Sequence, residues 1–282
     1  MSATLIDGKL IARAIKDAVR DEIATMTVKP GLAVILVGDD PASHVYVANK
    51  IKACAETGVE SVEYQLGADA SADEIAALID ELNGNTGING ILMQLPLPDH
   101  LSDVQEVLVQ RISPAKDVDG LTIGNAGKLI LGHEDGLVPC TPEGSLALIH
   151  SVKKDLTGLH AVVIGRSNLF GKPMAQLLLR ENCTVTMAHS RTIDLAGLCR
   201  SADIVVAAVG RPKMVKADWI KAGAIVIDVG INRMDDGKLC GDVDYAAASE
   251  VAGAITPVPG GVGPMTIACL MRNTLKAAKM DG

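Results

Sequence analysis

Val162-Val163-Ile164-Gly165-Arg166-Ser167-Asn168-Leu169-Phe170-Gly171-Lys172-Pro173 is an apolar strand that runs through a glycine-bounded turn into a predicted helix. Gly165 permits a tight turn, Gly171 permits close approach of the backbone, and the unpaired N–H groups that open the helix favour an anion. The stretch therefore predicts a dinucleotide phosphate site. The turn is longer than G-x-G-x-x-G, and Ser167 stands where the second glycine would be, so an ordinary strand-to-helix connection remains the alternative here.

Strand-length apolar runs and helix-period segments alternate on both sides of this stretch. In the first half we predict strands at Leu32 to Val37, Ser61 to Leu66 and Ile88 to Gln94, with helices near 42–57 and 71–83. In the second half we predict strands at His160 to Ile164, Thr184 to Ala188, Ile204 to Ala208 and Ala224 to Val229. This rhythm indicates an α/β protein of two lobes, an N-terminal α/β catalytic domain and a C-terminal Rossmann-like domain.

The domain boundary is placed from composition. Residues 113–142 are rich in Gly, Pro and Asp, and we predict an irregular junction there. The predicted domains are 1–120 and 121–263. The final helix, about 264–282, has apolar residues at helical spacing, and we expect it to pack back on the first lobe.

Composition excludes several classes of protein. The chain has 282 residues, a formal net charge of -8 and few aromatic residues (one Trp, three Tyr and one Phe), which opposes a nucleic-acid partner. Six scattered cysteines without metal-ligand spacing indicate reduced thiols and no metal site. We find neither a signal peptide nor an apolar run of membrane-spanning length, so we expect a cytoplasmic protein without a membrane partner.

A candidate proton-transfer group lies on the first predicted helix. Ser43, Tyr46 and Lys50 fall at i, i+3 and i+7, so they would share one helix face. A lysine beside a phenol in a partly dry cleft can have its pKa lowered toward neutrality, which suits acid/base work. The alternative is a solvated amphipathic helix. Because this pair precedes the glycine turn by more than a hundred residues, we expect the nucleotide and Lys50 to meet across a cleft.

Two further polar positions follow predicted strands. Gln94 ends the third strand, just before Leu95 and two prolines, at the carboxyl end where α/β proteins bind ligands. Asp117 and Asp119, in Lys-Asp-Val-Asp-Gly, could accept hydrogen bonds from a ligand. A buried glutamine bonded to backbone and a solvated turn are the respective alternatives.

Two loops in the second half have unusual chemistry. The stretch Pro257 to Thr266 combines three prolines with three glycines, giving a stiff loop that can approach a flat ligand closely. After the second Rossmann strand, Ser190 and Arg191 stand where an NAD site would place an acidic residue. With Arg166 they favour a 2'-phosphate and hence NADP, although Arg191 could also be a surface cation.

Six blocks together resemble the bifunctional methylenetetrahydrofolate dehydrogenase/cyclohydrolase family, and they occur in the family's order. These blocks are Y-x-x-x-K at 46–50, Q-L-P-L-P at 94–98, K-D-V-D-G at 116–120, P-C-T-P at 139–142, G-R-S-x-x-x-G-x-P at 165–173 and P-G-G-V-G-P-M-T at 259–266. The resemblance implies oxidation of 5,10-methylenetetrahydrofolate by NADP and hydrolysis of the 5,10-methenyl product to 10-formyltetrahydrofolate. It also implies a role in one-carbon metabolism and purine biosynthesis, and a homodimer.

The resemblance implies a role for each matching residue. Lys50 would be the central acid/base group, Tyr46 would orient the folate, Gln94 would tune Lys50, and Asp119 would anchor the pterin. The implied folate site is completed by Leu95, Pro259, Gly260, Gly261, Val262 and Gly263. The implied NADP site consists of Gly165, Arg166, Ser167, Ser190, Arg191 and Ile231.

Two rival hypotheses stay open on sequence alone. A dehydrogenase of another small substrate would share the Rossmann half but would have no use for the Pro-Gly loop. A non-catalytic nucleotide-binding regulator would keep the glycine turn, but it could dispense with Lys50, Gln94 and Asp119 together.

Overall fold

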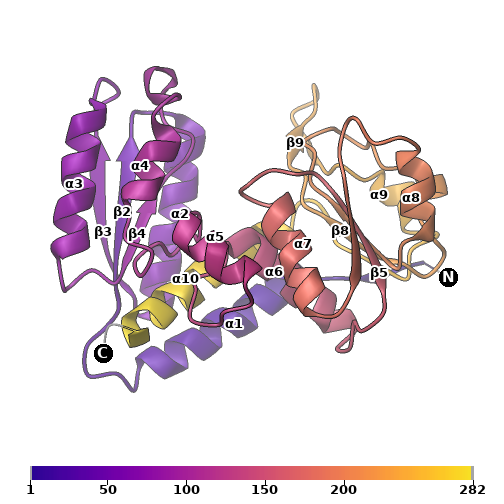
Figure 1. Ribbon diagram of the computed structural model, residues 1–282, viewed down its shortest axis with the longest axis horizontal. Helices are drawn as coiled ribbons and strands as arrows, with labels where there is room; N and C mark the ends of the chain where they lie inside the picture. Colours follow the sequence, from indigo (N-terminus) through magenta and orange to yellow (C-terminus); the bar gives the residue numbers. More distant parts are fainter. Residues whose placement is uncertain (1, 281–282) are drawn as a thin grey trace. The chain divides into compact units, whose positions relative to one another are not determined.

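The computed structural model describes residues 2–280, which form two compact units (Figure 1). The six-stranded unit consists of the chain up to Ala12 together with Thr141–Thr266, and the three-stranded unit of Arg13–Cys140 with the chain from Ile267 onward. The chain passes between the units within helices α1 (Gly8–Ile23) and α10 (Val262–Met280), and at the start of α6 (Cys140–Val152). Each unit is therefore discontinuous in sequence.

The three-stranded unit is organised around strand β2 (Gly31–Val37), which lies between β3 (Glu60–Leu66) and β4 (Gly90–Met93) in a parallel sheet. All seven residues of β2 are buried. Because side chains alternate along a strand, Ala33 and Ile35 pack in one apolar cluster while Leu32 and Val34 pack in another. A strand covered on both faces reads as a continuous apolar run, which is why the pattern predicted it.

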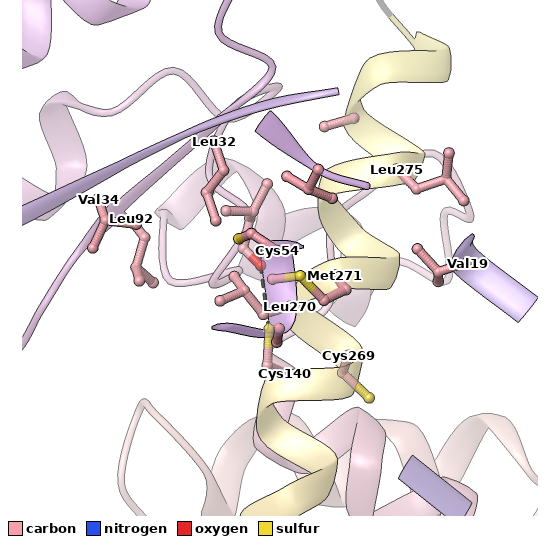
Figure 2. Packing of buried hydrophobic residues seen from close by; sticks show 14 of the residues in the cluster. Val19, Leu32, Val34, Cys54, Leu92, Cys140, Cys269, Leu270, Met271 and Leu275 are labelled. Atoms are coloured by element: carbon pink, nitrogen blue, oxygen red, sulfur yellow. Dashed lines mark hydrogen bonds between the residues drawn. The ribbon is translucent and has the colours of Figure 1, made fainter. Parts of the chain in front are cut away.

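Helices of the three-stranded unit cover both faces of its sheet. The Ala33–Ile35 face packs against α3 (Ala72–Gly84) and α4 (Gln105–Arg111). The other face packs against α1, α2 (Pro41–Thr57) and α10. Figure 2 shows this second cluster, in which Cys54 of α2 lies near Met271 and Leu270 of α10.

The last helix packs back on the first lobe, as predicted. Leu270 and Leu275 of α10 share a buried cluster with Val19 and Ile23 of α1. An ion pair between Lys279 and Glu22 joins the same two helices near their ends, and Figure 1 shows α10 beside α1.

The six-stranded unit is a parallel sheet in the order β1-β11-β8-β7-β5-β6. Its strands are β1 (Thr4–Leu5), β5 (His160–Ile164), β6 (Thr184–Ala188), β7 (Ile204–Ala207), β8 (Ile225–Asp228) and β11 (Ala254–Ile255). Its helices include α7 (Gly171–Arg180), α8 (Leu195–Ser201) and α9 (Tyr245–Ala248), and β9 (Asn232–Arg233) pairs with β10 (Leu239–Cys240) as a separate ribbon. Strand order reverses at β5, which has β6 on one side and β7 on the other. This arrangement confirms the Rossmann-like fold.

The structure differs from the sequence expectations in several places. Residues 113–142, expected to be irregular, contain helix α5 (Ile123–Ile130), and α1 was not predicted. The compact units also divide the chain at other positions than 1–120 and 121–263. Strand β1 pairs with β11 in the six-stranded sheet, while Leu137 and Cys140 belong to the core of the three-stranded unit. A two-residue strand has no measurable periodicity, so its partner could not be predicted.

All six cysteines are free thiols in the structure, and five of them are buried. Within residues 2–280, no helix is both long enough and apolar enough to cross a membrane.

Candidate functional site

Helix α2 positions Lys50 and Tyr46. The carboxylate of Asp40 caps the helix by accepting the N–H of Ser43 at 2.8 Å. Ser43 and Val47 face the core, so Ser43 is buried, whereas Tyr46 is 48% exposed and Lys50 is half-buried. Ser43 therefore does not lie on the accessible flank of the helix with Tyr46 and Lys50. Of the three residues predicted to share one face, only Tyr46 and Lys50 do so.

Gln94 lies directly against Lys50. It follows β4, is 9% exposed, and its Oε1 accepts a hydrogen bond from Lys50 Nζ at 2.9 Å. Its own Nε2 donates to the carbonyl of Leu95 at 2.6 Å. Because the amide nitrogen has this fixed partner, the amide oxygen is held toward the amine. The geometry leaves Lys50 in contact with a neutral acceptor rather than a hydrogen-bonded carboxylate.

Burial lowers the proton affinity of Lys50. Loss of hydration lowers the pKa of Lys50 below its ordinary value, and the charges of Asp119 and Cys140 oppose that shift. Loss of hydration likewise raises the pKa of Asp119, opposed by the charge of Lys50 and by a hydrogen bond with Cys140. An amine whose pKa moves toward neutrality can release and regain a proton during a reaction.

The Lys-Asp-Val-Asp-Gly loop holds Asp119 in place through its two preceding polar residues. Lys116 Nζ donates to the carbonyl of Leu82 in the last turn of α3, at 3.1 Å. The buried carboxylate of Asp117 accepts the N–H of Thr122 at 2.7 Å, where α5 begins. Lys116 and Asp117 therefore fold the loop, and Asp119 is the charged residue of this motif that interacts with Lys50.

The sequence analysis predicted no role for Cys140, although this residue lies in the P-C-T-P block. Its thiol donates to the carbonyl of Val118 at 3.2 Å, drawn as a dashed line in Figure 2. Asn273 of α10 donates to the same carbonyl at 2.9 Å. These two hydrogen bonds fix the backbone next to Asp119. In the sequence, the only signal for this role of Cys140 was its place in the P-C-T-P block.

The glycine turn after β5 needs both of its glycines. Gly165 has φ +133°, and a Cβ there would lie 2.4 Å from the carbonyl oxygen of Ala208. A Cβ on Gly171 would lie 2.2 Å from the carbonyl oxygen of Gly165. Ser167 Oγ accepts the N–H groups of Phe170 (3.2 Å) and Gly171 (3.4 Å), so its own O–H stays available to donate to an anion.

The turn after β6 lies beside the glycine turn. The N–H of Gly165 donates to the carbonyl of Ala188 at 2.8 Å, which joins the carboxyl ends of β5 and β6. A hydrogen bond from the N–H of His189 to Thr192 Oγ1, 2.9 Å long, closes the second turn. Ser190-Arg191 is exposed at the tip of this turn.

The charges at these two turns are mainly positive. Arg166 and Arg191 are both exposed. The nearest following carboxylate, that of Asp194, accepts the N–H of Gly197 at 3.0 Å as the cap of α8. A carboxylate that caps a helix is already hydrogen-bonded, so the two arginines dominate the surface that a ribose or its phosphate would meet.

The Pro259–Gly263 loop meets the segment after β8. Ile231 is 53% exposed, and its Cδ1 lies 4.0 Å from the position of a Cβ on Gly263. Val262, which opens α10, is buried at 5% exposure, whereas Pro259 and Gly263 are exposed. The structure thus brings together two residues that the sequence assigned to different ligands.

The predicted site residues fall into two sets. The three-stranded unit holds Tyr46, Lys50, Gln94, Leu95 and Asp119. The six-stranded unit holds Gly165, Arg166, Ser167, Ser190, Arg191, Ile231, Pro259, Gly260, Gly261, Val262 and Gly263. The Pro-Gly loop therefore belongs to the same compact unit as the glycine turn, and not to the unit that contains Lys50.

Comparison with known proteins gives matches along nearly the whole chain. Residues 6–119 match the catalytic domain of tetrahydrofolate dehydrogenase/cyclohydrolase, and residues 139–282 match its NAD(P)-binding domain. The bifunctional protein FolD of Dinoroseobacter shibae is 59% identical, with 98% of this chain and 95% of that protein covered.

Solved structures agree with this assignment. The bifunctional enzyme FolD, methylenetetrahydrofolate dehydrogenase/cyclohydrolase, from Campylobacter jejuni superimposes with a TM-score of 0.95 at 45% identity, covering 99% of both chains. The Trypanosoma brucei methylenetetrahydrofolate dehydrogenase-cyclohydrolase, solved with NADP cofactor and inhibitor, gives 0.91 at 36% identity over 99% of this chain and 98% of that one. With both of its halves matched in sequence and its fold matched over nearly the full length, the chain belongs to the tetrahydrofolate dehydrogenase/cyclohydrolase family.

Proposed function

We propose that Lys50 is the proton-transfer group of this enzyme and that Gln94 and Asp119 adjust its proton affinity. As a member of its family, the protein is a bifunctional dehydrogenase and cyclohydrolase of folate one-carbon metabolism. The observation on which the assignment rests is the 2.9 Å hydrogen bond between Lys50 Nζ and Gln94 Oε1, in surroundings that lower the pKa of the amine.

Hydrolysis of the 5,10-methenyl cation needs a base and then an acid. Neutral Lys50 takes a proton from the water as its oxygen bonds to the bridge carbon. The resulting ammonium gives that proton to the nitrogen whose bond to the bridge carbon breaks, and the remaining hydroxyl proton passes to solvent as the formyl C=O forms. A lowered pKa favours the first step, while Gln94 accepts a hydrogen bond from the ammonium form and keeps it oriented for the second. One amine can thus serve both steps in turn.

The folate itself is proposed to contact four further elements. Tyr46, half exposed on the flank of α2 beside Lys50, orients the pterin ring, and Asp119 accepts hydrogen bonds from it. Leu95, directly after Gln94, is proposed to contact the folate as well, and so is the backbone of Pro259–Gly263. Hydrolysis of a preformed cation requires no covalent nucleophile.

We propose NADP as the hydride acceptor. When bound, NADP+ would supply a hydride-accepting ring for oxidation of the methylene bridge of the substrate. The N–H groups of the glycine turn and the Ser167 hydroxyl hold its phosphates. Arg166, Ser190 and Arg191 hold the 2'-phosphate, which the exposure of both arginines and the capping role of Asp194 support.

A homodimer and a cytoplasmic location complete the proposal. Strand β6 lies at one edge of the six-stranded sheet, and most of its residues are partly exposed, as an edge that pairs with a second copy would be. Light scattering of the purified chain should give twice the 29.3 kDa mass of one chain, and a mass of one chain would contradict the dimer.

A single-cuvette absorbance assay tests the catalytic proposal. With 5,10-methylenetetrahydrofolate and NADP+, we expect NADPH to form at 340 nm, followed by decay of the methenyl absorbance. Because desolvation lowers the pKa of Lys50, the hydrolysis rate should rise with pH and reach its plateau well below the pKa of free lysine, about 10.4. Absence of NADPH formation would favour the nucleotide-binding regulator or a dehydrogenase of another substrate.

A further inference from the structure

A buried carboxylate ties together two loops at the carboxyl ends of neighbouring strands. Asp242 is fully buried between β10 and α9. Its Oδ2 accepts the N–H of Val209 at 2.6 Å and that of Gly210 at 3.0 Å. Its Oδ1 accepts the N–H of Arg211 and the Nδ2 of Asn232, both at 2.9 Å. Four neutral donors therefore converge on one charge.

The two loops flank a part of the sheet where a ligand is expected. Val209–Arg211 follows β7, and Gly230–Asn232 follows β8, the strand that pairs with β7 in parallel. In doubly wound α/β proteins, ligands bind outside the carboxyl ends of the strands. The buried Asp242 thus holds the backbone of the loop after β7 and the Asn232 side chain of the loop after β8.

A second buried carboxylate holds Asp242 in turn. Asp228 Oδ1 accepts the N–H of Gly230 at 3.0 Å and that of Asp242 at 2.8 Å, and Oδ2 accepts the N–H of Val243 at 2.9 Å. Burial, together with the nearby charge of Asp242, raises the pKa of Asp228 to about 6.

Two glycines leave space for these carboxylates. A Cβ on Gly230 would lie 2.3 Å from Asp242 Oδ1, and a Cβ on Gly241 would lie 1.8 Å from Asp228 Oδ2. Since no side chain fits at either position, the pair requires both glycines. The close fit shows that the two carboxylates and the two loops form one packed arrangement.

The residue held between these anchors is apolar and exposed. Ile231 lies between Gly230, whose N–H is bonded to Asp228, and Asn232, whose side chain is bonded to Asp242. Despite this fixed backbone, its side chain is 53% exposed. A rigid backbone that presents an exposed isoleucine at a strand end is suited to press against a flat ring.

We infer that Asp242, supported by Asp228, is a positioning residue that holds Ile231 and the Val209–Arg211 loop against the nicotinamide half of the bound dinucleotide. This inference rests on the proposed NADP site. It assigns the pair to the hydride step and not to hydrolysis, because hydrolysis depends on Lys50 in the three-stranded unit. A substitution at Asp242 should therefore slow NADP+ reduction and leave hydrolysis of the methenyl compound unchanged.

The test is Asp242→Asn, which keeps the size of the side chain but replaces one acceptor oxygen with a donor. We expect kcat for NADP+ reduction to fall about 10- to 100-fold, the cost of losing one buried charged hydrogen bond or more. Hydrolysis of supplied 5,10-methenyltetrahydrofolate without nucleotide should stay within threefold. With substrate deuterated at the methylene bridge, the isotope effect on kcat should increase, because a misplaced ring slows hydride transfer itself.

Two further variants keep the test decisive. Asn232→Ala removes only one donor and should lower kcat for NADP+ reduction three- to tenfold with hydrolysis unchanged. Asp244→Asn, at a neighbouring carboxylate that pairs with Lys216 at 3.5 Å, should change neither activity.

Three results would overturn the inference in an otherwise active wild type. They are normal NADP+ reduction in Asp242→Asn, equal loss of both activities in Asp242→Asn with no effect of Asn232→Ala, and an unchanged isotope effect. A wild type that reduces no NADP+ with 5,10-methylenetetrahydrofolate would instead contradict the proposed function itself.

Discussion

Lys50→Ala should lose cyclohydrolase activity by about 10²- to 10⁴-fold, the usual contribution of a general acid–base group. The variant should still bind NADP, because the glycine turn and the two arginines belong to the other compact unit. Removing the amine leaves Gln94 Oε1 without its 2.9 Å partner and removes the group that we propose takes a proton from water. Hydrolysis is measured as the decay of methenyl absorbance, and NADPH binding by fluorescence titration.

The matched control is Lys52→Ala. Lys52 is an exposed lysine on the same helix, so its removal changes net charge and helix propensity in the same way. We expect hydrolysis in Lys52→Ala to stay within twofold of wild type. Full turnover in Lys50→Ala, or equal losses in the two variants, would remove Lys50 from its proposed role.

Arg166→Ala should lower kcat/KM for NADP+ by about 10- to 100-fold while changing the value for NAD+ less than threefold. A charge-assisted hydrogen bond to a phosphate contributes about 1.5–3 kcal/mol, and NAD+ has no 2'-phosphate to accept it. The wild type should therefore prefer NADP+ strongly. The preference is measured as the ratio of kcat/KM for the two nucleotides with 5,10-methylenetetrahydrofolate.

Arg180→Ala provides the comparison, since Arg180 is exposed in the last turn of α7, the helix that follows the glycine turn. It removes an arginine from the same helix at the end distant from that turn. We expect its cofactor ratio to match that of wild type. Equal efficiency of wild type with NADP+ and NAD+ would rule out the proposed roles of Arg166 and Ser190.

The parts of the fold that could be predicted are those with a strong local signal. Strands β5 and β6 match their predicted bounds, because each is a short apolar or alternating run between turn residues. Helix α5 was missed because glycines interrupt its short sequence, and β1 because two residues show no period. The pairing of β1 with β11 joins segments far apart in the sequence, so no local pattern could predict it.

The candidate site shows the same limit. Motifs predicted Lys50, Gln94 and Asp119 as site residues. In the structure Lys50 donates a hydrogen bond to Gln94, and the charge of Asp119 acts to raise the pKa of Lys50. Residue chemistry alone could not separate Asp117 from Asp119, since both are loop carboxylates. The family resemblance singled out Asp119, and the fold buries Asp117 under the start of α5. Asp242 gave no signal, because its partners are backbone N–H groups, which every sequence contains.

The discontinuity of both units has a consequence for synthesis on the ribosome. Strand β1 is synthesised well before its partner β11, so the two strands can pair only after the residues between them have left the exit tunnel. The core of the three-stranded unit likewise needs Leu270, Met271 and Leu275, which follow later still. Neither unit can therefore complete its native contacts until β11 and α10 have left the exit tunnel, and a nascent chain that stalls before α10 exposes apolar surface to which chaperones bind.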